Sequence, residues 1–149
     1  MLSVKVDDGA FKAYLAKLSR NLQHMQPVME GIGIALEAAV SGRFESRTDP
    51  GGGAWAPWAQ STRDSYPDDA NGRLLDRYDD MLRGLSHQAD DNSVRVGFDQ
   101  DYSTFHEFGT DQMPRRGLLF DDPEEGTLGE DDERAVLDVL GDWLNRITA

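Results

Sequence analysis

Hydrophobic residues recur at steps of three and four along two successive segments near the start of the chain. The first stripe begins at Phe11 and ends at Met25, just before Pro27, and the second runs from Met29 to Phe44. This spacing places the apolar side chains on one face of a helix, and proline is tolerated in the first turn but not in the interior. We therefore predict two helices whose apolar stripes are buried in the core.

Hydrophobic and polar residues alternate in two further places, which is the pattern of a half-buried strand. Residues 2–6 alternate in this way through Leu2, Val4 and Val6 and predict a short N-terminal strand. Residues 85–89 and 94–98 do the same on either side of an Asp-Asp-Asn turn. The second pattern predicts an antiparallel hairpin.

Two more helices are predicted in the second half of the chain. Tyr102, Phe105 and Phe108 stand three residues apart ahead of Gly109, as in a short helix that ends at a left-handed glycine. We expect this helix to bury its three aromatic rings and to direct residues 113–120 outward. The final helix follows Thr127-Leu-Gly-Glu130, which has the spacing of a capping box. Its apolar face contains Val136, Leu137, Leu140, Trp143, Leu144 and Ile147.

The segment 48–72 lacks hydrophobic periodicity and is predicted to be a long loop. It opens with Asp49-Pro50-Gly51-Gly52-Gly53, which is strong turn chemistry. Trp55 and Trp58 are large apolar rings in this polar setting, so they either fold onto the core or contact a partner. Residues 73–86 read as a short extended piece followed by a short helix. The predicted fold class is α+β: two N-terminal helices and a C-terminal helix packed on a small antiparallel sheet, in a single domain over 1–149.

Composition narrows the function classes. The chain has no cysteine, which excludes disulfides, thiolate catalysis and sulfur-ligated metal sites. Its longest apolar stretch is too short to cross a membrane, and its N-terminus does not resemble a signal peptide. We therefore expect a soluble protein that is made inside a cell. The formal charge of −13 argues against tight binding to a nucleic-acid backbone.

The candidate chemistry is sparse. The three histidines lie in distant segments without a nucleophile motif, and we interpret His106 as a packing or hydrogen-bonding residue. Residues 121–132 have the length of a calcium loop, but Pro123 stands where a ligand oxygen is needed. We interpret Asp122 instead as the cap of a single turn. No catalytic residue, metal ligand or cofactor is predicted.

Two stretches, taken in order, resemble a known family. The first contains Phe44, the turn Asp49-Pro50-Gly51 and Trp55, and the second contains Tyr102, His106, Phe108, Gly109 and the run Met113-Pro114-Arg115-Arg116, with Leu74-Leu75-Asp76 between them. This combination resembles the Mu-like phage virion morphogenesis family, the tail-completion proteins of tailed bacteriophages. One departure is that Arg77-Tyr78-Asp79-Asp80 stands where such proteins usually continue with Thr-Gly.

The resemblance implies a structural protein of the virion tail or neck, assembled in the host cytoplasm. Such a protein acts as a ring subunit, expected to be hexameric, either as a tail terminator or as a head-side adaptor that helps join tail to head. Its partners would be further copies of itself and tail-tube or connector proteins, while DNA passes through an acidic lumen without tight binding. The expected interface anchors are Trp55, Trp58, Met113, Pro114, Arg115, Arg116 and Phe120.

A function from a different class is a small metal-dependent hydrolase or nuclease that uses the acidic segment 121–132. The two readings differ in their need for metal. The enzyme requires a divalent cation, whereas ring assembly should be unaffected by a chelator.

Overall fold

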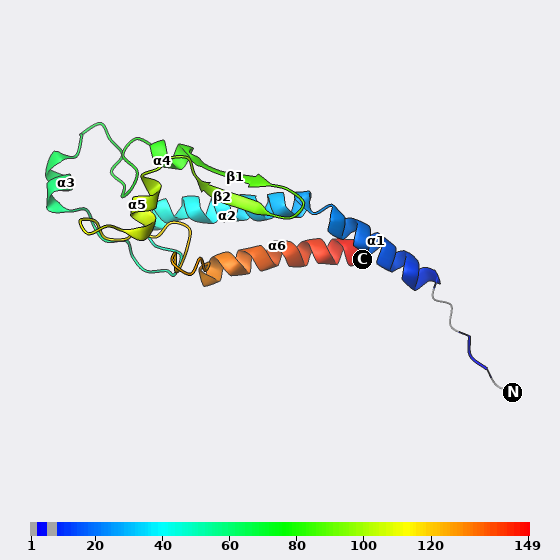
Figure 1. Ribbon diagram of the computed structural model, residues 1–149. Coiled ribbons are helices and arrows are strands. Elements are labelled where there is room, and N and C mark those ends of the chain that lie inside the picture. Colours follow the sequence, from blue (N-terminus) through cyan, green and yellow to red (C-terminus); the bar gives the residue numbers. More distant parts are fainter. Residues whose placement is uncertain (1–2, 6–8) are drawn as a thin grey trace.

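The computed structural model describes residues 3–5 and 9–149. Helix α2 (Gln26–Ser46) is its central element, with Pro27 in the first turn as predicted. It packs against helix α6 (Glu130–Thr148) on one side and against the hairpin on the other (Figure 1). The α+β class is therefore confirmed, with long helices on a small antiparallel sheet.

The hairpin consists of β1 (Leu85–Ala89) and β2 (Val94–Phe98), as the alternation predicted. The strands are antiparallel, with Leu85 opposite Phe98 and Ala89 opposite Val94. The hairpin turn also caps the central helix, because the carboxylate of Asp91 accepts the backbone N–H of Gln26 at 2.9 Å. The first turn of a helix has N–H groups without intrahelical partners, so this bond ties the hairpin to the start of α2.

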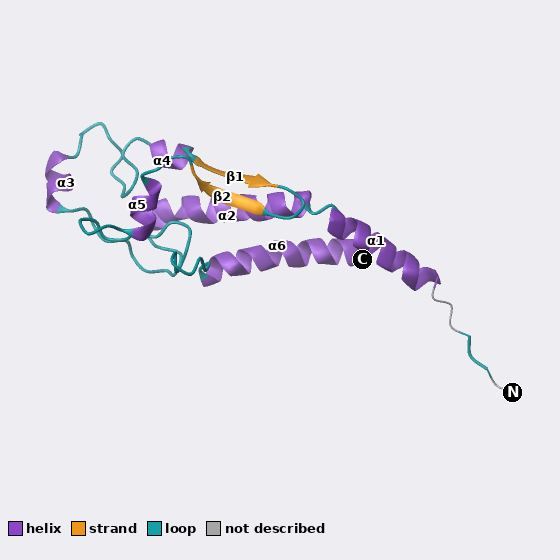
Figure 2. Ribbon diagram, in the orientation of Figure 1, coloured by secondary structure: helices purple, strands orange, loops and turns teal. Residues whose placement is uncertain are grey.

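Short helices and loops gather at one end of the molecule, as Figure 2 shows. We call residues 47–84 and 99–129 the loop lobe. It contains α3 (Gln60–Ser65), α4 (Asp80–Arg83) and α5 (Ser103–Phe108). Its core forms around the end of α2, where Phe44, Trp55, Leu74, Met81 and Leu118 are buried together. The rings of Phe44 and Trp55 meet edge to face with centroids 5.5 Å apart.

Helix α1 (Gly9–Gln23) extends beyond the rest of the molecule and meets α6 near its C-terminal end (Figure 1). None of its residues is buried, and Phe11 and Leu22 are exposed by 62% and 49%. The expectation that its apolar stripe belongs to the core is therefore wrong for the single chain. The reason is geometric: α1 continues past the end of the α2–α6 pair, so little of the chain lies across its apolar face.

Other local predictions also need correction. Leu2 and Val6 of the predicted N-terminal strand lie outside the described residues, and Val4 is in no strand. The loop 48–72 contains a helix, α3, that its composition did not predict. The capping box does not form: α6 starts after Gly129 without a side-chain cap, while Thr127 bridges to Asp122 in a turn. Within the described parts of the chain, no helix is long and apolar enough to span a membrane.

Candidate functional site

A cleft of about 740 Å³ opens in the loop lobe and brings together segments that are far apart in the sequence. One wall comes from residues 57–62, another from residues 73–81, and a third from α5 and the segment after it. The predicted site residues that line the cleft are Trp58, Tyr102, His106, Met113, Pro114 and Arg116. The cleft is therefore the candidate functional site.

Aromatic rings form the first wall of the cleft. Trp58 stacks on Tyr66 with ring centroids 4.6 Å apart, and the guanidinium of Arg77 lies 5.3 Å from the Tyr66 ring centroid. The Tyr66 hydroxyl donates to the backbone carbonyl of Asn71. Stacking and the cation–π contact hold Trp58 half-buried at the edge of the cleft, where part of its ring remains accessible.

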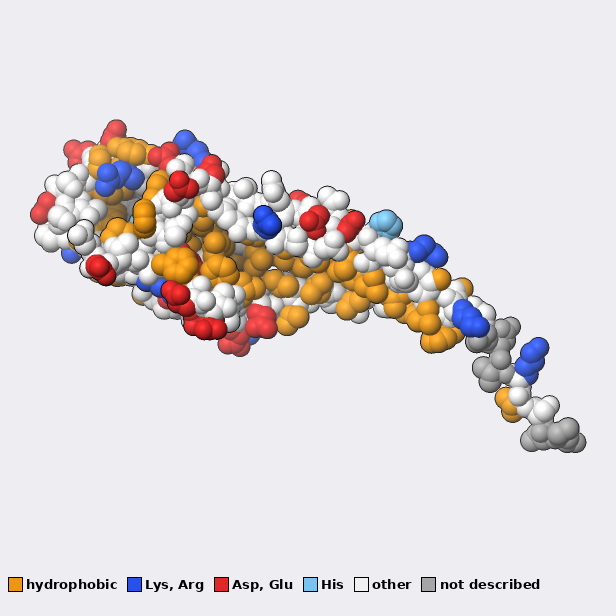
Figure 3. All heavy atoms as spheres, in the orientation of Figure 1, with side chains coloured by type: hydrophobic (Ala, Val, Ile, Leu, Met, Phe, Trp, Pro, Cys, Tyr) orange, Lys and Arg blue, Asp and Glu red, His pale blue; other side chains and the backbone are white. Residues whose placement is uncertain are grey.

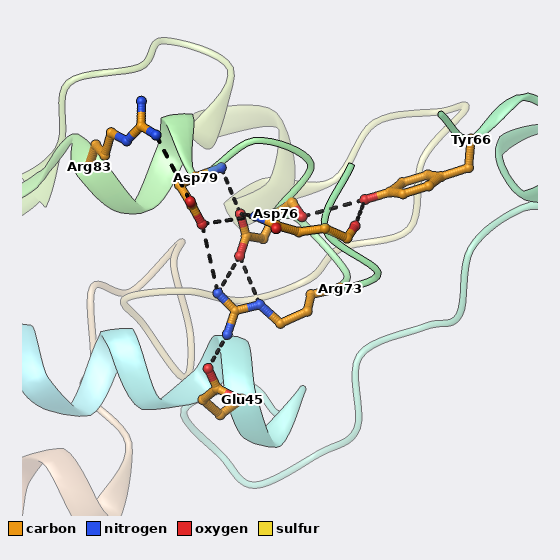
Figure 4. A network of polar contacts seen from close by, with 7 residues as sticks. Glu45, Tyr66, Arg73, Asp76, Asp79 and Arg83 are labelled. Carbon is orange, nitrogen blue, oxygen red and sulfur yellow. Dashed lines mark hydrogen bonds and ion pairs between the residues drawn. The ribbon is translucent and has the colours of Figure 1, made fainter. Parts of the chain in front are cut away.

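A buried carboxylate, Asp76, organises the second wall (Figure 4). It accepts hydrogen bonds from Arg73 Nε at 2.8 Å, from the Asp79 backbone N–H at 2.9 Å and from the Asn71 side chain at 3.2 Å. Burial raises the pKa of Asp76, but the bonds from Arg73 and Asn71 outweigh it and hold the pKa below its ordinary value. Arg73 also pairs with Glu45 of α2, so the network fastens this loop to the central helix.

His106 lies on the third wall of the cleft, and its side chain is half-buried. Burial lowers the pKa of its imidazole, and the nearby charge of Arg116 lowers it further. Its Nδ1 is buried and has no hydrogen-bond partner among the described residues. The ring meets Tyr102 edge to face at 6.3 Å, which agrees with the packing role, and its backbone carbonyl accepts the N–H of Arg116 at 2.8 Å.

Behind this wall, Glu107 fixes the following segment by binding its backbone. Its buried carboxylate accepts N–H groups from Leu118 at 2.5 Å, Leu119 at 3.1 Å and Phe120 at 2.8 Å. Arg115 completes the arrangement, because its Nε donates to the Glu107 backbone carbonyl at 2.7 Å. In a strand these N–H groups would donate to the carbonyls of a neighbouring strand. Among the described residues this loop has no such neighbour, so the Glu107 carboxylate accepts the hydrogen bonds instead.

Arg116 and Trp55 join the same segment to the tryptophan loop. Arg116 donates to the backbone carbonyls of Ala56 and Pro57, each at 2.8 Å. Trp55 Nε1 donates to the carbonyl of Gly117 at 3.0 Å. Both side chains are buried in the single chain, so of the two readings of Trp55 the structure shows the core.

The middle of segment 113–120 therefore faces inward, contrary to the prediction that the whole segment is directed outward. Arg116 and Leu118 are buried, and the guanidinium of Arg115 is half-buried against backbone groups of its own chain. Met113, Phe120 and Trp58 are half-buried, and Pro114 is exposed. Their role as interface anchors stays a prediction.

The orientation of α5 also differs from the prediction. Tyr102, Phe105 and Phe108 are exposed by 40–55% instead of buried. The helix is turned so that Glu107 points inward, because its carboxylate has the backbone partners described above. Gly109 has φ 72° and ψ 173°, a conformation that only glycine adopts readily, so a positive φ does end the helix.

The turn Asp49-Pro50-Gly51 seats the loop lobe against the start of α6. The Asp49 carboxylate accepts the N–H of Gly53 at 2.8 Å and closes the turn. Pro50 is buried beside Gly129, where an added Cβ would lie 2.1 Å from the Pro50 carbonyl oxygen. This motif is thus a packing element at the junction of two segments.

The acidic segment 121–132 is occupied by structural bonds. The Asp122 carboxylate accepts the N–H groups of Glu124 and Glu125 at 3.0 and 3.1 Å, which confirms the capped turn. Asp132 is buried and forms an ion pair with Arg43 of α2, whose other nitrogen donates to the Leu118 carbonyl at 2.8 Å. Among the described residues, no group of three potential metal ligands is found.

The fold and these clusters define a small α+β protein whose buried charges hold its own loops in place. The chain belongs to the phage virion morphogenesis family, whose model matches residues 6–145. No curated protein and no solved structure matches it significantly. Membership of this family makes it a phage protein of virion assembly.

Proposed function

We propose that this chain is a ring subunit that completes the phage tail at its head-proximal end and helps join tail to head, without enzymatic activity. Its place would be the virion tail or neck, reached from the host cytoplasm during assembly. The family match supports a role in assembly. The observation that carries the finer proposal is the amount of apolar side chain that the single chain leaves exposed.

A subunit of a closed ring needs two different faces that fit each other. The chain has apolar surface in two separate places. One is the loop lobe, with the α5 aromatics beside the cleft. The other comprises residues 9–46, 85–98 and 130–149, which we call the helical half; there Leu15 of α1 and Leu137 of α6 are exposed. Large exposed apolar surfaces are characteristic of interfaces between proteins.

Charge supports the same role. A ring at the tail end must let the genome pass, and an acidic lumen would repel the phosphates and prevent DNA from sticking. Each chain carries a formal charge of −13, so six copies in a ring would repel one another. Apolar contacts or local pairs of opposite charge would therefore have to hold the ring together. A basic channel in the assembled ring would overturn this part of the proposal.

The decisive experiment is to inactivate the gene in the phage and examine the particles by electron microscopy. We expect filled heads and separate tails, with joining restored when purified protein is added to the lysate. In wild-type virions, a map should place a ring of this chain at the head-proximal end of the tail. Particles that join normally without the protein would overturn the proposal.

A chelator separates this function from metal-dependent hydrolysis. Joining restored by the purified protein should be the same with and without EDTA, and titration calorimetry should detect no micromolar binding of Ca²⁺ or Mg²⁺. Loss of joining in EDTA, together with metal uptake, would favour the enzyme.

A further inference from the structure

An apolar groove runs between the hairpin and α6, with α2 between them. It measures about 690 Å³ and is lined almost entirely by hydrophobic side chains. We call this the apolar groove. Its hydrophobic lining residues are Met29, Ile32, Leu36 and Val40 of α2, Val94 and Val96 of β2, Val136 and Leu140 of α6, and Leu119, Phe120 and Leu128. Two charged residues, Arg95 and Asp132, also line it.

Figure 3 shows that hydrophobic side chains form a band along this face and that the band continues onto α1. On α1 the exposed members are Phe11, Tyr14, Leu15 and Leu22. A helix with an apolar stripe of this kind buries it against another element. Figure 1 shows α1 extending past the ends of α2 and α6, and no residue of α1 lines the groove.

We propose that α1 of one copy lies in the apolar groove of a neighbouring copy. This inference rests on the proposed ring subunit and names one of its interfaces. The lengths agree: α1 has 15 residues and is about 22 Å long, and the α2 side of the groove from Met29 to Val40 is about 17 Å long. In one chain, α1 and the groove lie one after the other along the same hydrophobic band. When α1 of one copy enters the groove of the next, the two copies are therefore shifted relative to each other along that band.

Charge identifies a second copy as the occupant. Helix α1 carries Lys12, Lys17 and Arg20 and has no acidic residue, although the whole chain carries −13. The end of the groove beside the start of α6 is acidic. Residues 121–133 surround the lining residue Leu128 and contain eight aspartates and glutamates, of which seven are exposed and Asp132 is buried and paired with Arg43. The basic helix of one copy therefore matches the acidic end of the next, which offsets the repulsion between like-charged subunits.

The first test places a charge on the apolar face of α1 in the full-length chain. The double variant Leu15→Asp/Leu22→Asp should weaken self-association at least tenfold in sedimentation velocity, without lowering the thermal midpoint of the subunit. The matched control is Ala13→Asp/Ala16→Asp, which adds the same two charges at exposed positions on the other side of the helix. The control should associate like the wild type. Equal weakening in both variants would overturn the proposal.

The second test separates docking on a neighbour from docking of α1 on its own groove through the link His24-Met25. Leu128→Lys places a positive charge in the groove at an exposed position, where it should leave the core folded and repel the basic α1, and Val94→Lys does the same on β2. A groove variant and the α1 variant should each be monomeric alone and form a 1:1 complex when mixed, because one supplies α1 and the other supplies the groove. No complex in the mixture, or a monomeric wild type, would overturn the inference.

Failure of the inference and failure of the proposed function have different signatures. Association through α1 by a chain that is absent from the virion would overturn the proposed function and keep the inference. A ring at the tail end whose grooves hold something other than α1 would keep the function and overturn the inference.

Discussion

The loop lobe and the helical half of the molecule achieve order in opposite ways. The loop lobe has little regular structure, yet its aromatic core and its buried charges are fully engaged within one chain. The helical half consists of long regular elements, yet α1 buries none of its residues and the apolar groove stays open. The amount of regular secondary structure in a region therefore does not indicate whether the single chain buries that region's apolar surface.

The difference follows from where backbone groups find partners. A helix satisfies its own N–H and C=O groups, so α1 can persist with an apolar face that a neighbour covers. A loop has no such internal partners, and buried side chains must supply them. In the loop lobe Glu107 binds three N–H groups and Arg116 binds two carbonyls. Substitutions at these buried groups should therefore destabilise the lobe, whereas substitutions on the exposed face of α1 should only weaken association.

The largest effect is expected where the two regions meet, at the buried pair Arg43–Asp132. Arg43→Met leaves Asp132 buried without its partner, and it should lower the free energy of unfolding by about 3–5 kcal/mol in urea denaturation. Arg43→Met/Asp132→Leu should recover much of that loss. The control is Arg134→Met, which breaks two exposed pairs on α6, with Glu130 and Asp131, and should cost at most about 0.5 kcal/mol. A double variant no better than the single one would contradict this account.

Within the loop lobe, the two tryptophans should behave differently. Trp55→Ala removes a buried ring and its bond to Gly117, and should cost on the order of 3 kcal/mol in the same assay. Trp58→Ala removes a half-buried ring and should cost roughly 1 kcal/mol. Similar losses for both would show that Trp58 belongs to the core as much as Trp55 does.

Glu107→Gln tests whether a carboxylate holds the segment after α5. The amide of glutamine keeps one acceptor oxygen and turns a donor toward the remaining N–H groups, so we expect a loss of about 2 kcal/mol. Glu124→Gln, at an exposed position in the capped turn, is the matched control and should change stability little. Hydrogen exchange should become faster at Leu118, Leu119 and Phe120 in the first variant alone.

The sequence predicted what periodicity can encode. The hydrophobic spacing that marks a helix or a strand lies within the segment itself. For this reason the existence and type of four elements were predicted: the helices over 9–23, 26–46 and 130–148, and the hairpin. Periodicity does not say whether the chain itself covers an apolar face, which is why α1 was wrongly assigned to the core. The same limit applies to α5, whose aromatic spacing says nothing of the three N–H groups that turn Glu107 inward.

The polar part of the site was only partly predictable. Arg43 and Asp132 did carry a signal, because each lies on an apolar stripe, three residues after Val40 and four before Val136. Where the chain covers the stripe, a charge at such a position is buried, and a buried charge needs a partner. Glu107 and Asp76 carried no comparable signal. The partners of Glu107 are backbone N–H groups brought near by the loop fold. Those of Asp76 are the side chains of Arg73 and Asn71 and one backbone N–H, all within an irregular loop. The cleft itself depends on three distant segments and has no local signature.

The smallest predicted effect lies within the helical half, where His87 of β1 joins the hairpin to α2. Its Nε2 lies 2.7 Å from Glu30, and Nδ1 is bonded to Glu37. These bonds raise the pKa of His87 above its ordinary value of 6.5. Stability from the protonated ring is therefore fully present below pH 6.5 and is lost as pH rises through the higher folded pKa. Both glutamates are partly exposed, so the contribution is modest.

We expect His87→Gln to lower the thermal midpoint by about 2–4 °C at pH 5.5–6, with the difference from the wild type shrinking toward pH 9. His24→Gln, at an exposed position, is the control and should change the thermal midpoint little. A difference that grows with pH would mean that the neutral ring makes the favourable contact. Because His87 also packs on Gly33, where an added Cβ would lie 2.4 Å from the ring, Gly33→Ala should displace the ring and reproduce the loss at low pH. Self-association should be unchanged in these variants, because His87 contacts α2 of its own chain and does not line the apolar groove.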